Sequence, residues 1–240
     1  MNKEQKETEV NSTTVWIIAI AAVLILFNQI QLFQLSNMLG TPIFGSAFTS
    51  VKTFSGGDLK DIDINGITST AQAIAATIDL DSGSDAQTVI NKMIPKGTPS
   101  YGTELGISYD DPVKALNFLA RELYPRINQD VQTNKPEVWT RYLNLATKPV
   151  GISCEYCCGI GPIGVSADGK SRCGCAHNPA ILALVLYLMD RTDMTDGEIL
   201  REAMYWKALW FPKDMVKLGL QISGGDASVL ADVPSQVGGC

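Results

Sequence analysis

Apolar residues recur along most of the chain at the spacing of an α-helix. Ile67, Ala71, Ile74 and Ile78 share one face of such a helix, because side chains three or four positions apart lie above one another. A second stripe runs over 86–94, after serine and aspartate residues that suit a helix cap. This half of the chain therefore predicts amphipathic helices that bury one face.

Proline marks the bounds of the next two predicted helices. Asp111 followed by Pro112 is a cap with proline in the first turn, and the apolar stripe that begins there ends at Pro125. A helix over 134–146 repeats the arrangement, and Pro149 stops it. Both boundaries follow from proline, which lacks a backbone N–H and restricts the residue before it.

The last third of the chain predicts three more helices. We expect Asn178 to cap a helix that continues through 180–189, where the residues are apolar all round, so this helix should be the buried centre of the domain. A capping box at Thr195 and Glu198 opens the next helix, which ends before Pro212. A short helix over 213–222 follows, and no stretch alternates as a strand does. The predicted fold class is all-α, a compact helical-bundle domain with an inserted Cys-rich loop.

The N-terminal pattern differs, because residues 15–27 contain no polar side chain. Thirteen helical residues rise only about 20 Å, which is shorter than the hydrocarbon core. Residues 28–35 keep apolar side chains at half of their positions, so 15–35 together predict a transmembrane anchor. A cleaved signal peptide also fits a short apolar run, but the arm before it is nearly neutral and no small-x-small site follows closely.

These patterns divide the chain into five segments, in which an anchor tethers a helical domain to the membrane. We expect a polar arm at 1–14, the anchor at 15–35, a linker at 36–66, a helical domain at 67–222 and a flexible tail at 223–240. Lys3 and Lys6 precede the anchor and no basic residue follows it before Lys52. The positive-inside rule then predicts a single-pass protein with a cytoplasmic N-terminus and an extracytoplasmic main domain.

The net charge of the chain limits the classes of molecule that it is expected to bind. The formal net charge is −6 and there is no basic cluster, so a nucleic-acid partner is excluded. The predicted partners are the lipid bilayer, through 15–35, and a protein that exchanges electrons or metal with the domain. We expect a binding or carrier protein rather than an enzyme.

The candidate chemistry is concentrated in one segment, 151–177. Five of the six cysteines and the only histidine of the chain fall within it. The segment is rich in glycine and has no helical period, so it predicts a loop or a short hairpin inserted in the domain. The candidate metal ligands are Cys154, Cys157, Cys158, Cys173, Cys175 and His177.

The spacing of these cysteines predicts a metal site. Cys154 and Cys157 form a Cys-x-x-Cys turn, and Cys173 and Cys175 form a second close pair. Two such pairs supply the four ligands of a structural zinc site or an iron–sulfur cluster. Copper(I) is a further possibility, because it prefers two or three thiolates. The helix that follows has its positive end near the second pair, which favours thiolate, the form that binds metal.

Two other interpretations use the same cysteines. A thiol redox or sulfur-relay protein would use Cys157 and Cys158, with Cys240 at the end of the chain as an accessory thiol. A structural or scaffold protein would use disulfides as a staple, which an oxidising compartment permits. Adjacent Cys157 and Cys158 are poor partners for each other, and Cys240 is available as a partner for the fifth cysteine of the segment.

Residues 173–177, read as Cys-Gly-Cys-Ala-His, resemble the Cys-Gly-Cys-x-His core of the PCYCGC-motif proteins. That resemblance implies a secreted or membrane-anchored Cys-rich protein with a metal-related role. Ser171 and Arg172 stand where the motif has Cys-Tyr, so the resemblance is restricted to five residues. The anchor and the Val-Gly-Gly-Cys ending at Cys240 also resemble those of uncharacterised archaeal membrane-anchored proteins, which implies no function.

Overall fold

The computed structural model describes residues 58–156, 161, 163–231 and 233–239. The predicted arm and anchor at 1–35 lie outside the described residues, as do Cys157, Cys158 and Cys240. Within the described part of the chain, every helix is too short or too polar to cross a bilayer. The predicted anchor therefore stays a prediction.

The described residues form an all-helical domain, as predicted. The principal helices are α2 (Thr70–Thr77), α3 (Ala86–Met93), α4 (Gly102–Leu105), α5 (Pro112–Asn117), α6 (Tyr124–Asn134), α7 (Pro136–Ala146), α8 (His177–Arg191), α9 (Asp196–Trp210) and α10 (Pro212–Ser223). Short turns are η1 (Leu59–Asp61), η2 (Ile64–Gly66) and η4 (Ala227–Leu230), and η3 (Phe118–Leu123) is a π-helix. Extended pairing in these residues is limited to one antiparallel bridge, between Val165 and Ser171.

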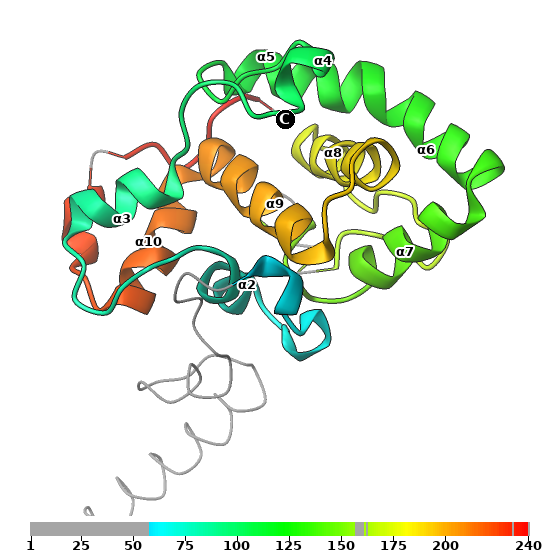
Figure 1. The fold of residues 1–240 in the computed structure, drawn as a ribbon. Helices are drawn as coiled ribbons and strands as arrows, with labels where there is room; N and C mark the ends of the chain where they lie inside the picture. Colours follow the sequence, from blue (N-terminus) through cyan, green and yellow to red (C-terminus); the bar gives the residue numbers. More distant parts are fainter. Residues whose placement is uncertain (1–57, 157–160, 162, 232, 240) are drawn as a thin grey trace, which may run out of the picture. The chain divides into compact units, whose positions relative to one another are not determined.

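Helix α8 is the buried centre of the domain, as its all-apolar sequence predicted. Its residues from Ala180 to Met189 are all buried, because η3, α6, α7 and α9 pack around it. Helix α9 packs in turn against α2 and α10, and Figure 1 shows α8 and α9 in the middle of these helices. The segment between α7 and α8 carries the cysteines, so both of its ends are attached to this core.

The predicted cap of α8 is wrong. The helix begins at His177, and Ala176 occupies the N-cap position without a side-chain hydrogen bond. Asn178 therefore lies inside the first turn, with Pro179 after it, where a missing N–H costs nothing because first-turn N–H groups have no helical acceptor. The Asn178 side chain is left available for contacts outside the helix.

The predicted end of a helix at Pro125 is also wrong. Helices α5, η3 and α6 follow one another without a break from Pro112 to Asn134, with helical backbone angles at both junctions. The N–H of Tyr124 donates to the carbonyl of Leu119, five residues back, which widens the turn. Pro125 follows this widened turn directly, so the π-helix accommodates a proline within one continuous helix.

Both ends of the described chain contact the core. The described part of the predicted linker forms η1 and η2, and Leu59 is buried there. At the other end, the Val237 N–H donates to the Trp210 carbonyl at 2.7 Å and Lys213 N–H donates to the Pro234 carbonyl at 3.3 Å. These contacts fix where the tail runs, and its predicted flexibility stays a prediction.

Candidate cysteine site

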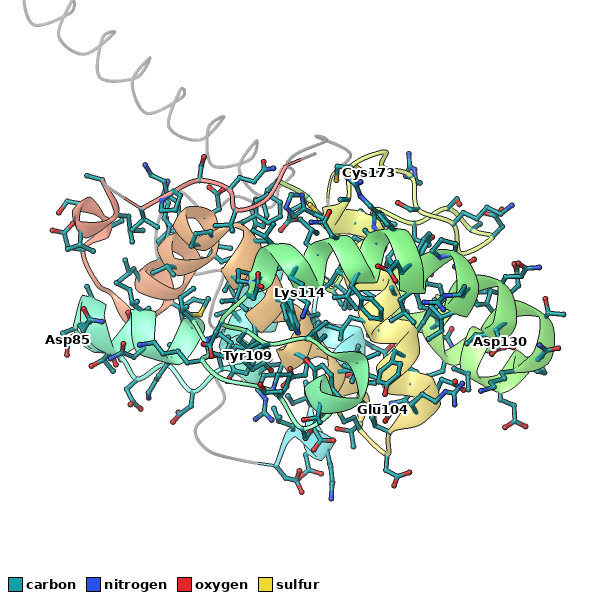
Figure 2. All side chains as sticks on the ribbon, turned by 90° about the horizontal axis from the view of Figure 1, so that it is seen from above. Asp85, Glu104, Tyr109, Lys114, Asp130 and Cys173 are labelled. Carbon is teal, nitrogen blue, oxygen red and sulfur yellow. The ribbon has the colours of Figure 1, made fainter. Side chains whose placement is uncertain are left out.

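The described cysteines of the loop are all buried. Cys173 is disulfide-bonded, and its Sγ lies 3.2 Å from the Sγ of Cys175. Cys154 lies near the other end of the loop, where its backbone N–H donates a hydrogen bond to the Asn178 side chain on α8. Figure 2 labels Cys173 in the loop next to α8. The structure thus brings the second predicted pair, Cys173 and Cys175, into direct sulfur–sulfur contact.

Asn178 joins three parts of the loop. Its Oδ1 accepts a hydrogen bond from the Cys154 N–H at 3.0 Å, and its Nδ2 donates to the Gly164 carbonyl at 2.8 Å and to Ser171 Oγ at 2.7 Å. The residue is fully buried, so removal of its side chain would leave the buried Cys154 N–H without this acceptor and away from water. The first turn of α8 therefore holds the cysteine segments together.

The middle of the loop turns back on itself and rests on α6 and α7. Arg172 N–H donates to the Gly164 carbonyl at 2.9 Å, which closes the turn beside the Val165–Ser171 bridge. The hydroxyl of Tyr124 accepts from Ser171 N–H at 3.0 Å, and the hydroxyl of Tyr142 donates to the Gly169 carbonyl at 3.1 Å. Tyr124 and Tyr142 thus position the segment that leads to Cys173.

His177 is buried and its two ring nitrogens differ. Nε2 lies 3.1 Å from the Val237 carbonyl oxygen, and a carbonyl only accepts, so Nε2 carries the hydrogen. In the neutral ring Nδ1 then carries the lone pair, and it has no hydrogen-bond partner in the described part of the chain. The ring packs on Phe211, with centroids 4.7 Å apart, and edge-on to Trp210 at 5.9 Å.

A buried lysine fixes the start of the loop. The Lys207 ammonium donates to the Gly151 carbonyl at 2.6 Å and to Thr70 Oγ1 at 3.1 Å, and lies 3.7 Å from the Glu155 carboxylate. Burial lowers the pKa of Lys207, and the charges of Glu155 and Cys154 act in the opposite direction. Cys154 therefore lies within the electrostatic reach of a buried cation.

The candidate metal ligands that the structure describes do not by themselves form a metal site. No group of three or more His, Cys, Asp or Glu side chains comes together among the residues that the structure describes. Two thiolates that share a tetrahedral zinc ion at about 2.3 Å lie about 3.8 Å apart, and the sulfurs of Cys173 and Cys175 are closer, at 3.2 Å. Cys157 and Cys158 lie outside the described residues, so the six-residue ligand set stays a prediction.

Sequence reasoning missed two residues that shape the site. The sequence predicts Asn178 as a helix cap, because Asn before Pro is a common helix start, and it holds no signal for the contacts of Asn178 with the loop. Lys207 was missed although a signal exists: it is the only charged residue in the otherwise apolar or aromatic segment 203–210. A single charge on the buried face of a helix indicates a specific partner.

Comparison of the chain with protein-family models, with curated proteins and with solved structures found no match.

Proposed function

We propose that this protein is a membrane-tethered thiol–disulfide exchange protein whose exchanging sulfurs are those of Cys173 and Cys175. One observation carries the proposal: Cys173 is disulfide-bonded, and the Cys175 sulfur lies 3.2 Å from it. Disulfide exchange requires a third sulfur next to a disulfide. The predicted anchor at 15–35 would hold this site at a membrane surface.

The exchange step balances without an external oxidant. The Cys175 thiolate attacks Cys173 Sγ, a bond forms between these two sulfurs, and the former partner of Cys173 leaves as a thiolate. Net oxidation of a client follows when one client thiolate attacks the resident disulfide and a second client thiol resolves the mixed disulfide. The client gains a disulfide and the site gains two thiols.

The first experiment maps disulfides in the full chain, purified without reductant and blocked at once with an alkylating reagent. We expect the Cys173 peptide to be cross-linked. Incubation at mildly alkaline pH should convert part of it to the Cys173–Cys175 linkage, because only thiolate attacks. Cys175→Ser should abolish this conversion and slow reduction by glutathione, whereas Cys154→Ser, a matched buried cysteine outside the pair, should leave both rates near those of the wild type.

The same measurements can contradict the proposal. Complete alkylation of all six cysteines in the unreduced protein would show that no disulfide is present. Equal glutathione kinetics in the wild type and Cys175→Ser would show that the neighbouring sulfur takes no part in exchange. A redox titration against glutathione buffers supplies the potential, which separates an exchanging disulfide from a structural one that resists the glutathione pool.

A second candidate function, binding of zinc, copper or an iron–sulfur cluster for metal handling or electron transfer, is favoured by His177. Its Nε2 is oriented by the Val237 carbonyl and its Nδ1 has no partner among the described residues. A histidine that ligates a metal is commonly oriented in this way through its other nitrogen. If a metal binds, His177 and the reduced cysteines of the loop would hold it.

Anaerobic purification followed by elemental analysis tests this second function. Stoichiometric metal in the wild type, lost in His177→Ala and retained in Asn91→Ala, would support it. Bound iron would add charge-transfer absorption in the visible range, whereas zinc would be colourless. A preparation without metal that still performs exchange would favour the first function.

A further inference from the structure

A series of aromatic rings leads from His177, the first residue of α8, into the core. His177, two residues after Cys175, lies edge-on to Trp210 with centroids 5.9 Å apart. Trp210 lies 5.5 Å from Trp206, and Trp206 lies 5.1 Å from the ring of Tyr109. Helix α9 supplies both tryptophans, four residues apart on one face, so this part of the series runs along the helix.

The series ends at two tyrosines that share one carboxylate. Tyr101 and Tyr109 both donate their hydroxyl hydrogens to Glu202 Oε2, at 2.6 and 2.5 Å. Trp206 Nε1 donates to the Tyr101 hydroxyl oxygen at 2.8 Å, so the indole contacts both tyrosines. Figure 2 labels Tyr109 on the loop before α5, well apart from Cys173.

The Glu202 carboxylate is unusual in its surroundings. It is buried, and no Lys, Arg or His forms an ion pair with it within the described ranges. A buried carboxylate with only neutral donors is held there at a cost in desolvation. A process that transfers a proton to it would remove that buried charge.

We propose that Tyr101 and Tyr109, connected through Trp206 and Trp210, are a one-electron donor for the cysteine loop, with Glu202 as the proton acceptor. The proposal rests on the proposed redox role of the loop. It adds a protective activity: radicals formed on the loop sulfurs are reduced from within the core. The oxidant is a one-electron oxidant of the radical class, which converts a loop thiol to a thiyl radical.

The step balances in charge and atoms. The thiyl radical gains one electron and becomes a thiolate, while a tyrosine loses one electron and its phenolic proton passes along the existing hydrogen bond to Glu202. The products are a thiolate, a neutral tyrosyl radical and a neutral carboxylic acid. The buried cluster thus changes from one negative charge to none, so the same desolvation that penalises the carboxylate favours the oxidised state.

The test uses the full chain, light and a soluble photo-oxidant. Tris(bipyridine)ruthenium(II) with persulfate generates one-electron oxidation, and samples frozen rapidly afterwards are measured by electron paramagnetic resonance. We expect a tyrosyl signal that narrows when the tyrosine rings are deuterated and that is lost in the double variant Tyr101→Phe and Tyr109→Phe. Trp210→Phe and Trp206→Phe should lose the signal too, because each interrupts the series.

A control and a further variant complete the test. Trp139→Phe is the matched control, because Trp139 packs on Tyr142 with centroids 5.1 Å apart and has no ring contact with the series among the described residues. Its signal should equal that of the wild type. Glu202→Gln keeps the side-chain volume and one acceptor oxygen but is a far weaker base, so its signal should be lost although the rings are intact. This variant keeps the test decisive if a tryptophan variant fails to fold.

A second readout reports on the cysteines. Mass spectrometry of the 173–175 peptide should show more sulfinic and sulfonic acid after illumination in Trp210→Phe than in Trp139→Phe, because unreduced sulfur radicals proceed to these products. Equal oxidation in both variants, or a tyrosyl signal that persists in the double tyrosine variant, would overturn the proposal. Failure of disulfide exchange alone would leave the tyrosyl signal present, so the two proposals fail separately.

Discussion

The Lys207 ammonium donates a hydrogen bond of 2.6 Å to the carbonyl oxygen of Gly151, and this contact joins the last turn of α9 to the first residue of the cysteine loop. Gly151 adopts a φ of +90°, and a Cβ there would lie 2.8 Å from Thr70 Oγ1. The carbonyl reaches the lysine because glycine permits this backbone conformation. The start of the loop therefore depends on a buried charge.

The buried ammonium predicts a dependence of stability on pH. Burial lowers the pKa of Lys207 in the folded state, whereas the unfolded chain has the usual value of about 10.4. The unfolded state then binds more protons as pH rises toward about 10, so the free energy of unfolding should rise with pH because of this residue. Lys207→Met should remove that rise, measured by urea denaturation between about pH 7 and about pH 10.

The comparison variant for this effect is Lys217→Met, because Lys217 lies exposed on α10. Its pH profile should run parallel to that of the wild type. Parallel profiles for Lys207→Met and the wild type would show that the lysine has the same pKa in the folded and unfolded states.

The two tyrosines that donate to Glu202 predict a loss of stability in alkali. Burial, and next the charge of Glu202, raises the pKa of both Tyr101 and Tyr109. The unfolded state then ionises first, at about pH 10, and stability that is complete below that value is lost above it. The double variant Tyr101→Phe and Tyr109→Phe should show a smaller loss above about pH 10.

Absorbance near the tyrosinate band supplies the check. In the wild type we expect Tyr101 and Tyr109 to be among the tyrosines that ionise only together with unfolding, as followed by circular dichroism, because burial also raises the pKa of Tyr142 and Tyr156. The difference between the wild type and the double variant gives the share of Tyr101 and Tyr109. Ionisation of these two residues in the folded protein, near the pKa of free tyrosine, would contradict the prediction.

Replacement of the buried Asn178 amide is predicted to lower the stability of the domain strongly. Asn178→Ala leaves the Cys154 N–H and the Ser171 hydroxyl without this partner inside the protein, and should lower the free energy of unfolding by about 2–4 kcal/mol. Asn178→Asp keeps the acceptor of the Cys154 N–H but loses the donors, so its effect should be large as well. Asn91→Ala, on the exposed face of α3, should change stability by less than about 0.5 kcal/mol.

A side chain at Gly169 is predicted to destabilise the domain by a steric clash, and a comparison with Gly83 separates that clash from backbone strain. A Cβ at Gly169 would lie 2.3 Å from Trp139 Cζ2, and φ there is +79°. Gly83 has nearly the same φ, +82°, with nothing within 4 Å of a Cβ. Gly83→Ala should therefore cost about 1 kcal/mol, and Gly169→Ala about 2–4 kcal/mol, measured by urea denaturation. Equal costs would mean that Trp139 moves aside freely.

Local signals in the sequence predicted most helices, because the physics that starts and stops them is local. Asp85 and Asp111 accept the cap hydrogen bonds from Thr88 and Lys114, and the capping box of α9 is complete. The all-apolar run of α8 correctly indicated the centre of the core. Pro125 misled, because the effect of a proline depends on the width of the turn before it, which no local pattern records.

The sequence predicted where along the chain the candidate site lies, but not which residues from other helices support it. The density of cysteines located the loop, and the Cys-x-Cys spacing brought Cys173 and Cys175 together. The residues that support the loop contact it over long separations: Lys207 follows Gly151 by 56 positions, and Asn178 follows Cys154 by 24. Such contacts are set by how α8 and α9 pack, and a one-dimensional pattern does not contain that information.

The widened turn of η3 has a consequence for how this chain tolerates length changes. A π-turn holds one more residue than the α-turn that it replaces, so it shifts the rotational phase of everything after it by about 100°. Ala115 and Leu116 face the core before the shift, and Ile127 and Val131 face it afterwards. Loss of one residue from 118–123 would remove the widened turn, and the resulting ordinary helix would still present the same side chains of α6 to the core. This stretch is therefore the place where the helix from Pro112 to Asn134 tolerates a one-residue deletion without a change of its buried face.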